Sequence, residues 1–143
     1  MTDDIDDRII ELLVRNGRAS FAQIAGDVGL SAHAVAERIR RLEARGTIRG
    51  YTARVDQREF GRGLAAYVDV RLAPTTDPAT FERLALGLPA TQHIAFVTGR
   101  FDYIVHLACK DAGDLDQTVR ELRSRGGVAA TETRIVMRTT DPR

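Results

Sequence analysis

The chain has 143 residues, of which 43% are hydrophobic and 29% charged, with a formal net charge of +1 and one cysteine. This composition is ordinary for a globular protein and excludes an intrinsically disordered chain. Its apolar runs are too short to span a membrane, and a single cysteine excludes an internal disulfide. The acidic start, MTDDIDDRII, lacks the basic-then-apolar order of a signal peptide, so we expect a cytoplasmic protein without a membrane partner.

The first 45 residues predict three short helices around a small core. The first helix, over residues 4–15, carries apolar residues at helical spacing: Ile5, Ile9, Leu12 and Leu13. Asn16-Gly17 is a turn signal that ends it. So short a unit buries little surface, and its core alone is marginal.

Residues 20–46, SFAQIAGDVGLSAHAVAERIRRLEARG, predict a helix-turn-helix. Ser20 with Gln23 three residues later forms a capping box, and Gly29 tolerates the sharp turn between the helices. Ser31 can cap the second helix, which ends near Gly46. Its buried stripe is Val35, Ile39 and Leu42. Two linked helices with an exposed, arginine-bearing second helix are typical of a unit that enters the DNA major groove.

Charge is unevenly distributed along this part of the chain. Residues 2–14 hold five acidic residues and one arginine, a net charge of −4, whereas residues 38–54 hold six arginines and one glutamate, a net charge of +5. A concentrated basic stripe on a nearly neutral protein suits a polyanion approached from one side. A solvated helix face would explain the basic run alone, but its coincidence with a helix-turn-helix favours DNA.

Two segments connect this unit to the rest of the chain. Ile48 to Val55 alternates loosely and predicts a strand that could form a wing beside the helices. Residues 56–63, with two glycines, predict a linker. We therefore divide the chain into a helix-turn-helix domain (1–55), a linker (56–63) and a second domain (64–143).

The second domain predicts the order strand, helix, strand, strand, helix, strand. Residues 64–72 alternate as a half-buried strand, and Pro78 can begin a helix. Strands 92–98 and 103–109 flank the turn Gly99-Arg100-Phe101-Asp102, a helix covers 114–124, and the last strand covers 128–138. The final five residues, TTDPR, read as a frayed tail. The fold class is therefore α+β, a winged helix-turn-helix followed by a ferredoxin-like βαββαβ domain.

The expected sheet has helices on one face only. Tyr103, Val105, Leu107 and Cys109 share one face of their strand, and Ile104, His106 and Ala108 share the other, so neither face is plainly polar. An apolar sheet face without helices predicts self-association, and a homodimer is the simplest form.

Four stretches together resemble the Lrp/AsnC, or feast/famine, family of bacterial and archaeal transcription regulators. They are DDRIIELLVRNGRASFAQIA, VGLSAHAVAERIRRLEARGTIRGYTARVD, FVTGRFDYIVHLA and TETRIVM. The resemblance covers nearly the whole chain in order. It implies an N-terminal DNA-binding domain and a C-terminal regulatory domain that dimerises, commonly assembles into octamers, and often binds an amino acid between dimers.

The predicted DNA contacts lie on the second helix of the helix-turn-helix, away from its buried stripe. Recognition helices read bases with their N-terminal turns, so alanine methyls can meet thymine and Glu37 can accept from cytosine. The arginines are better placed for phosphates, although pairing with Glu37 or Glu43 across a helix turn would equally explain Arg38 or Arg41. The expected contacts with double-stranded DNA are Ser31, Ala32, His33, Ala36 and Glu37, with Arg38, Arg40 and Arg41 at phosphates.

The turn after residue 98 is the second candidate site. Gly99 lets exposed amide N–H groups approach a carboxylate, while Arg100 and Asp102 offer the opposite charges that match a zwitterionic amino acid. Thr98 and Thr133 are possible wall residues. A hairpin turn with two solvated charges is the alternative that the residues alone leave open.

Other functions find less support in the sequence. The three histidines lack metal-ligand spacing, and no nucleotide-binding motif is present, so we expect no metal and no cofactor. A relative of sirohaem decarboxylases, which resemble this family, would need a porphyrin pocket near His93, His106 or Arg100, and the arginine-rich helix argues against that enzyme. An architectural DNA-binding protein without an effector is the remaining alternative.

Overall fold

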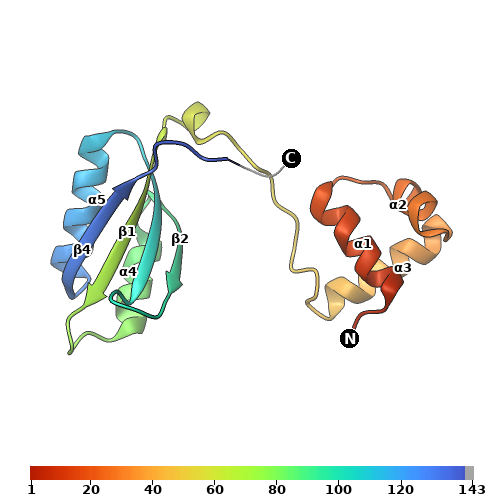
Figure 1. Cartoon of the computed structure of the whole chain (residues 1–143), viewed down its shortest axis with the longest axis horizontal. Coiled ribbons are helices and arrows are strands. Elements are labelled where there is room, and N and C mark those ends of the chain that lie inside the picture. The colour runs from red at the N-terminus through yellow and green to blue at the C-terminus, as the bar shows by residue number, and fades with distance from the viewer. Residues whose placement is uncertain (141–143) are drawn as a thin grey trace. The chain divides into compact units, whose positions relative to one another are not determined.

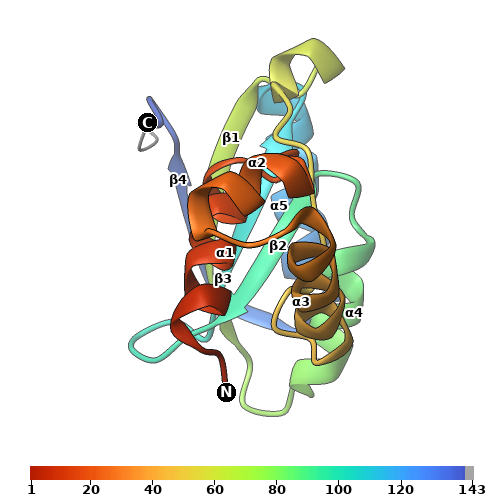
Figure 2. The same cartoon turned by 90° about the vertical axis from the view of Figure 1, so that its right-hand side faces the viewer.

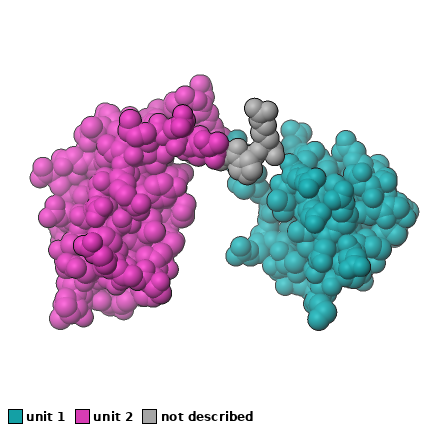
Figure 3. Space-filling model, viewed as in Figure 1, with its two compact units in different colours: residues 1–54 teal, residues 55–143 magenta. Residues whose placement is uncertain are grey.

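The computed structural model describes residues 1–140, and the last residues of the expected tail, 141–143, lie outside the described residues. The chain divides into two compact units, residues 1–54 and residues 55–143 (Figure 3). No helix in the described part is long and apolar enough to cross a membrane.

The first unit consists of the three predicted helices, α1 (Asp4–Arg15), α2 (Phe21–Val28) and α3 (Ala32–Ala44). Ser20 and Gln23 form the predicted capping box at α2, and Ser31 accepts from the Ala34 N–H at the start of α3. Gly29 adopts φ 70°, the left-handed conformation that the turn between α2 and α3 requires. The helix-turn-helix prediction is confirmed.

The core of this unit is small and entirely aliphatic. One apolar stripe from each helix meets at its centre, and the buried members are Ile9, Ile24, Ala25, Val35, Ile39 and Leu42. Phe21 lies outside this core and is 47% exposed. It stands at the first position of α2, beyond the region where the three stripes meet.

The predicted wing is wrong. Residues 48–55 form no strand in the described structure (Figure 1, Figure 2). A strand needs a neighbour to take its N–H and C=O groups, and no other strand of the described chain pairs with this segment. Within the expected linker a short 3-10 helix, Gln57–Phe60, lies at the start of the second unit.

The second unit has the predicted ferredoxin-like order. Its elements are β1 (Leu64–Leu72), α4 (Pro78–Gly87), β2 (Thr91–Phe96), β3 (Tyr103–Cys109), α5 (Ala112–Arg125) and β4 (Val128–Ile135). The strands form one antiparallel sheet in the order β2-β3-β1-β4. Both helices lie behind this sheet in Figure 1. β2 and β4 end before the expected 98 and 138, so the connection from β2 to β3 is longer than a four-residue turn.

The face of the sheet beneath the helices forms the larger core. Val68, Val105 and Leu107 are fully buried there, together with Phe81 of α4 and Leu122 of α5. Tyr103 is also buried. Its hydroxyl donates to a carboxylate oxygen of Glu82 at 2.6 Å, and burial with this bond raises its pKa to about 12.

The opposite face, which we call the open face, carries the alternate residues of the strands. Tyr67 of β1 stacks on His106 of β3 with ring centroids 4.7 Å apart, and His93 of β2 meets the same imidazole edge-on at 5.0 Å. Asp69, 9% exposed, accepts from Arg134 of β4 at 3.0 Å. The open face is therefore mixed in polarity, with the half-buried ring of His106 between the exposed rings of Tyr67 and His93.

Candidate nucleic-acid interface and ligand site

The solvent-facing side of α3 is the candidate nucleic-acid interface. The apolar stripe holds one side of the helix against the core, which turns the opposite side outward. His33, Glu37, Arg40 and Arg41 are all exposed, and Ser31 and Ala32 lie exposed at the helix start. These are six of the eight residues predicted to contact DNA.

Glu37 and Arg40 form an ion pair across one turn of α3. Both side chains remain more than half exposed, so solvent screens the pair and a nucleic acid can compete for either partner. The alternative reading of the sequence placed such a pair on Arg38 or Arg41, and the structure places it on Arg40.

Ala36 does not belong to the exposed face, so its predicted base contact is wrong. The residue is 5% exposed and points into the helical unit. Its position follows Val35 and precedes Ile39 by one turn, which widens the buried stripe beyond the three residues that the sequence suggested.

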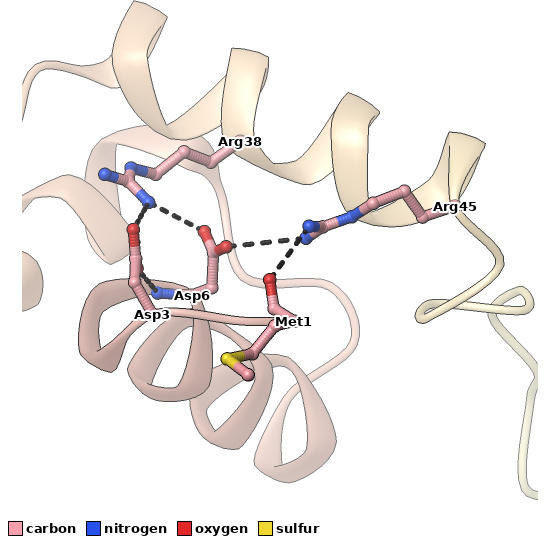
Figure 4. A network of polar contacts seen from close by, with 5 residues as sticks. All are labelled: Met1, Asp3, Asp6, Arg38 and Arg45. Atoms are coloured by element: carbon pink, nitrogen blue, oxygen red, sulfur yellow. Dashed lines mark hydrogen bonds and ion pairs between the residues drawn. The ribbon is translucent and has the colours of Figure 1, made fainter.

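Arg38 is also placed differently from its prediction as a phosphate contact. Its guanidinium donates to Asp3 at 2.7 Å and to Asp6 at 2.8 Å, and its side chain is only 21% exposed (Figure 4). The bond from Arg38 holds the pKa of the Asp3 carboxyl below its usual value, and the two carboxylates raise the pKa of Arg38. The positive charge of Arg38 is thus balanced by two carboxylates of its own unit.

Asp6 is shared between an arginine of α3 and the arginine that caps the C-terminus of that helix. Besides Arg38 it faces Arg45, at 3.5 Å, and Arg45 also donates to the backbone carbonyl of Met1 at 3.1 Å (Figure 4). These groups line a hollow of about 580 Å³ between α1 and α3. Arg41 borders the same hollow, is exposed, and forms no ion pair with any residue that the structure describes. Arg41 is therefore the arginine on this side that remains available to a phosphate.

The sequence could not reveal these carboxylate contacts, because they join residues more than thirty positions apart. Asp3 is recognisable as the N-cap of α1, where it accepts from the Asp6 N–H at 2.8 Å. The sequence shows that the first turn of α1 is acidic. Which side of α3 this turn faces depends on how the helices pack.

The candidate ligand site is the connection between β2 and β3. Gly99 has φ 111°, and a Cβ added there would meet nothing within 4 Å. A side chain at this position would be strained by the backbone conformation alone. The turn is closed by a bond from the Val97 N–H to the Asp102 carbonyl at 2.9 Å.

Asp102 has a structural role that the prediction did not include. Its carboxylate accepts from the Leu72 N–H at 2.8 Å, and its own N–H donates to the Val70 carbonyl at 2.8 Å. These bonds fasten the turn to the end of β1. An ammonium group could reach this carboxylate only in addition to, or instead of, the Leu72 amide.

The remaining predicted ligand residues are not gathered into one pocket. Arg100 lies over the ring of Phe101, 5.9 Å from its centroid, and Thr98 is exposed. Thr133 lies on β4, where it is paired with Val68 of β1, and it is exposed. β1 therefore separates it from the turn between β2 and β3. Within residues 1–140, no three histidine, cysteine or carboxylate side chains come together as metal ligands would.

Comparison with known proteins follows the same division of the chain. Residues 3–43 match the AsnC-type helix-turn-helix domain, and residues 65–143 match the Lrp/AsnC ligand binding domain. The HTH-type transcriptional regulator Rv2324 of Mycobacterium tuberculosis is 33% identical over 135 residues, covering 94% of this chain and 91% of the relative. LrpA of the same organism is 29% identical over 134 residues, covering 94% and 89%.

Solved structures of similar proteins superpose on nearly the whole length of this chain. The feast or famine regulatory protein Rv3291c of M. tuberculosis, complexed with L-methionine, has a TM-score of 0.91 and 28% identity, with 98% of this chain and 95% of that one covered. The leucine response regulatory protein LrpA of M. tuberculosis has a TM-score of 0.84 and 28% identity, with 99% and 96% covered.

Proposed function

This chain belongs to the Lrp/AsnC family of transcription regulators, and we propose that it reads DNA with the exposed face of α3 and binds a free amino acid at the turn between β2 and β3. The observation that carries the first part is the outward cluster of His33, Glu37, Arg40 and Arg41 on a helix whose other side is buried. In this proposal the early turns of α3 contact base edges, while Arg40 and Arg41 contact phosphates.

Salt dependence of DNA binding tests this interface. Neutralising a phosphate contact lowers the magnitude of the slope of log K against log salt by about one. Arg41→Ala should produce this change and weaken binding to every duplex about equally. His33→Ala should instead reduce discrimination between a duplex selected from a random pool and an unselected one.

Two results would contradict the proposed interface. One is binding that does not change with salt concentration. The other is an Arg40→Ala, Arg41→Ala double variant that keeps the salt slope of the parent protein. Arg120→Ala, in the second unit, is the matched control, since it removes one exposed arginine outside α3.

The second part of the proposal, an amino-acid ligand, is supported by the turn and by a relative. A zwitterion needs N–H donors for its carboxylate and an acceptor for its ammonium group. The open backbone at Gly99 and the carboxylate of Asp102 supply these groups, and a relative with 28% identity has been solved with L-methionine. Arg100, Thr98 and Thr133 complete the proposed set.

Calorimetry against the twenty amino acids tests the ligand proposal. At least one should bind, and Gly99→Val should abolish the binding because a β-branched residue cannot adopt φ 111° without strain. Gly87→Ala is a control outside the turn, where an added Cβ has open space. Failure of every amino acid to bind, or binding unchanged in Gly99→Val, would refute the site.

We further propose that the smallest DNA-binding assembly is a homodimer formed through the open face. The exposed ring of Tyr67 and the half-buried ring of His106 lie there, and no helix of the described chain lies above them. Two symmetry-related α3 helices would then occupy half-sites about 10 base pairs apart, or a multiple of that spacing. Light scattering and footprinting test the two statements separately.

A further inference from the structure

Two carboxylates at the start of α1, Asp3 and Asp6, hold Arg38 of α3 and Arg45 at the C-cap of α3 (Figure 4). Asp6 is the centre of this arrangement, because its oxygens face Arg38 at 2.8 Å and Arg45 at 3.5 Å. It is a charged residue only 8% exposed, in a unit whose core is otherwise aliphatic. Removing a buried carboxylate from water is costly unless its partners compensate, so this placement requires both arginines.

Apart from the Tyr51 hydroxyl, which donates to Glu43 at 2.9 Å, the remaining attachment of α3 to the other helices is apolar. Val35, Ile39 and Leu42 form an apolar stripe, and apolar contacts tolerate small rotations and shifts more readily than hydrogen bonds do. Arg38 and Arg45 are seven residues apart, which is about 10.5 Å along a helix axis. Two anchors at that separation, both held by one carboxylate, fix the direction of the helix as well as its position.

We propose that Asp6 is a positioning residue for DNA recognition: it holds Arg38 and Arg45 so that the exposed face of α3 meets the base edges at one defined angle. Asp3 supports it by capping α1 while accepting from Arg38. The inference rests on the proposed DNA interface of α3. In it, Arg38 and Arg45 bind carboxylates at the start of α1, while the outward Arg40 and Arg41 contact phosphates.

A simple charge argument makes the opposite prediction. Asp3 and Asp6 occupy the unit that approaches a polyanion, so removing either charge should strengthen DNA binding by reducing repulsion. Positioning requires that removing the Asp6 charge weakens binding to a preferred sequence. The sign of the effect therefore separates the two accounts.

The test compares Asp6→Asn with Asp7→Asn in the full chain. Both variants remove one negative charge from α1, but Asp7 is exposed and has no ion pair among the described residues. The probes are a duplex selected from a random pool by the parent protein and an unselected duplex of equal length. Binding is measured at a temperature where circular dichroism shows the variant fully folded, so that loss of folded protein does not enter the result.

Asp6→Asn should bind the selected duplex about tenfold more weakly, the effect of roughly one mismatched base pair, and the unselected duplex almost as well as the parent. Its salt slope should stay unchanged, because Arg38 and Arg45 contact no phosphate in this proposal. Asp7→Asn should bind both duplexes as well as or better than the parent, and Asp6→Glu should recover part of the discrimination.

Equal or tighter binding of the selected duplex by folded Asp6→Asn would overturn the proposal. A salt slope lower by about one in Arg38→Ala would also overturn it, since Arg38 would then contact phosphate directly. If Asp6→Asn does not fold, Arg45→Gln takes its place, because Arg45 is 43% exposed and its loss leaves the Arg38 bond intact. Unchanged discrimination in that variant counts against the proposal. A salt slope lower by about one in Arg41→Ala is a separate result that concerns only the interface of α3.

Discussion

The two units hold their helices by different means. In the second unit the core cluster beneath α4 and α5 has thirteen buried residues, none of them charged. In the first unit the buried aliphatic core has six residues, and α1 is also joined to α3 by carboxylates and arginines. A large apolar core can fix its elements by close packing, whereas three short helices with a narrow contact gain direction from polar bonds.

This difference predicts where each unit is vulnerable. The second unit should be sensitive to changes beneath its helices and tolerant on its open face. The first unit should lose a larger share of its stability from a single truncation, because fewer side chains remain to compensate.

The largest effect is expected from a charge in the second core. Val105 is fully buried on the helix-covered face, so Val105→Asp leaves a carboxylate without a partner and should cost several kcal/mol, enough to unfold the unit. Ile104→Asp, one residue earlier and on the open face, should leave the fold intact and abolish self-association. Circular dichroism and light scattering on both variants check this pair. A folded Val105→Asp, or a dimeric Ile104→Asp, would break the distinction between the two faces.

Leucine truncation compares the two cores directly. Leu42 of α3 and Leu107 of β3 are both fully buried, and Leu→Ala in a core costs about 2–5 kcal/mol. Leu42→Ala should bring the small unit close to unfolding, while Leu107→Ala should leave the larger one folded at room temperature. Thermal unfolding of each variant, followed by amide exchange in α3 and β3, measures the two losses. Equal loss of protection in both units would show that core size does not set their vulnerability.

Acidification should act on the open face. Burial, aided by the nearby His93, lowers the pKa of His106 below 6.5, so the folded state favours the neutral imidazole. Below pH 6.5 the unfolded chain therefore binds more protons at this imidazole than the folded chain does. The free energy of unfolding falls as the pH drops from 6.5 through the lower folded-state pKa of His106. His106→Gln should remove this loss, and His93→Gln should keep most of it, because burial is the larger cause. Denaturant unfolding between pH 7.5 and 5 checks the difference at a protein concentration where the chain is monomeric. An identical pH response in the parent and His106→Gln would assign the loss to other groups.

The smallest effect is expected from exposed ion pairs outside either core. Asp116 and Arg120 lie one turn apart on α5 at 2.8 Å, with most of both side chains in solvent. Solvent screens such a pair, so Asp116→Asn should shift the unfolding midpoint hardly at all. A loss as large as that of Asp6→Asn would show that exposure does not separate the two kinds of ion pair. Chemical unfolding in low and high salt measures both.

Local signals explain how much of this molecule was predictable. Ser20, Ser31 and Gly29 each act through neighbours within a few residues, and the strand alternation of β1 and β3 depends only on a period of two. The helix-turn-helix and the order of the second unit follow from such patterns. The strand expected over 48–55 failed because alternation cannot supply a pairing partner.

The candidate sites were predictable only where they depend on one helix or one turn. The outward positions of His33, Glu37 and Arg41 follow from the stripe opposite them. Ala36 and Arg38 do not, since the width of the stripe and the position of α1 are set by packing among three helices. Likewise, nothing near Asp102 in sequence indicates that it accepts from Leu72, thirty residues earlier.

The single cysteine of the chain, Cys109, is a native probe of opening in the second unit. It is fully buried at the end of β3, and burial raises the pKa of its thiol to about 11. Few of these thiols are then ionised near neutral pH, and alkylating reagents react with the thiolate. Modification must therefore wait until β3 separates from the sheet. With one thiol per chain, each alkylated molecule records one such opening event. The rate at which alkylated protein forms therefore measures how often this core opens, without an introduced label.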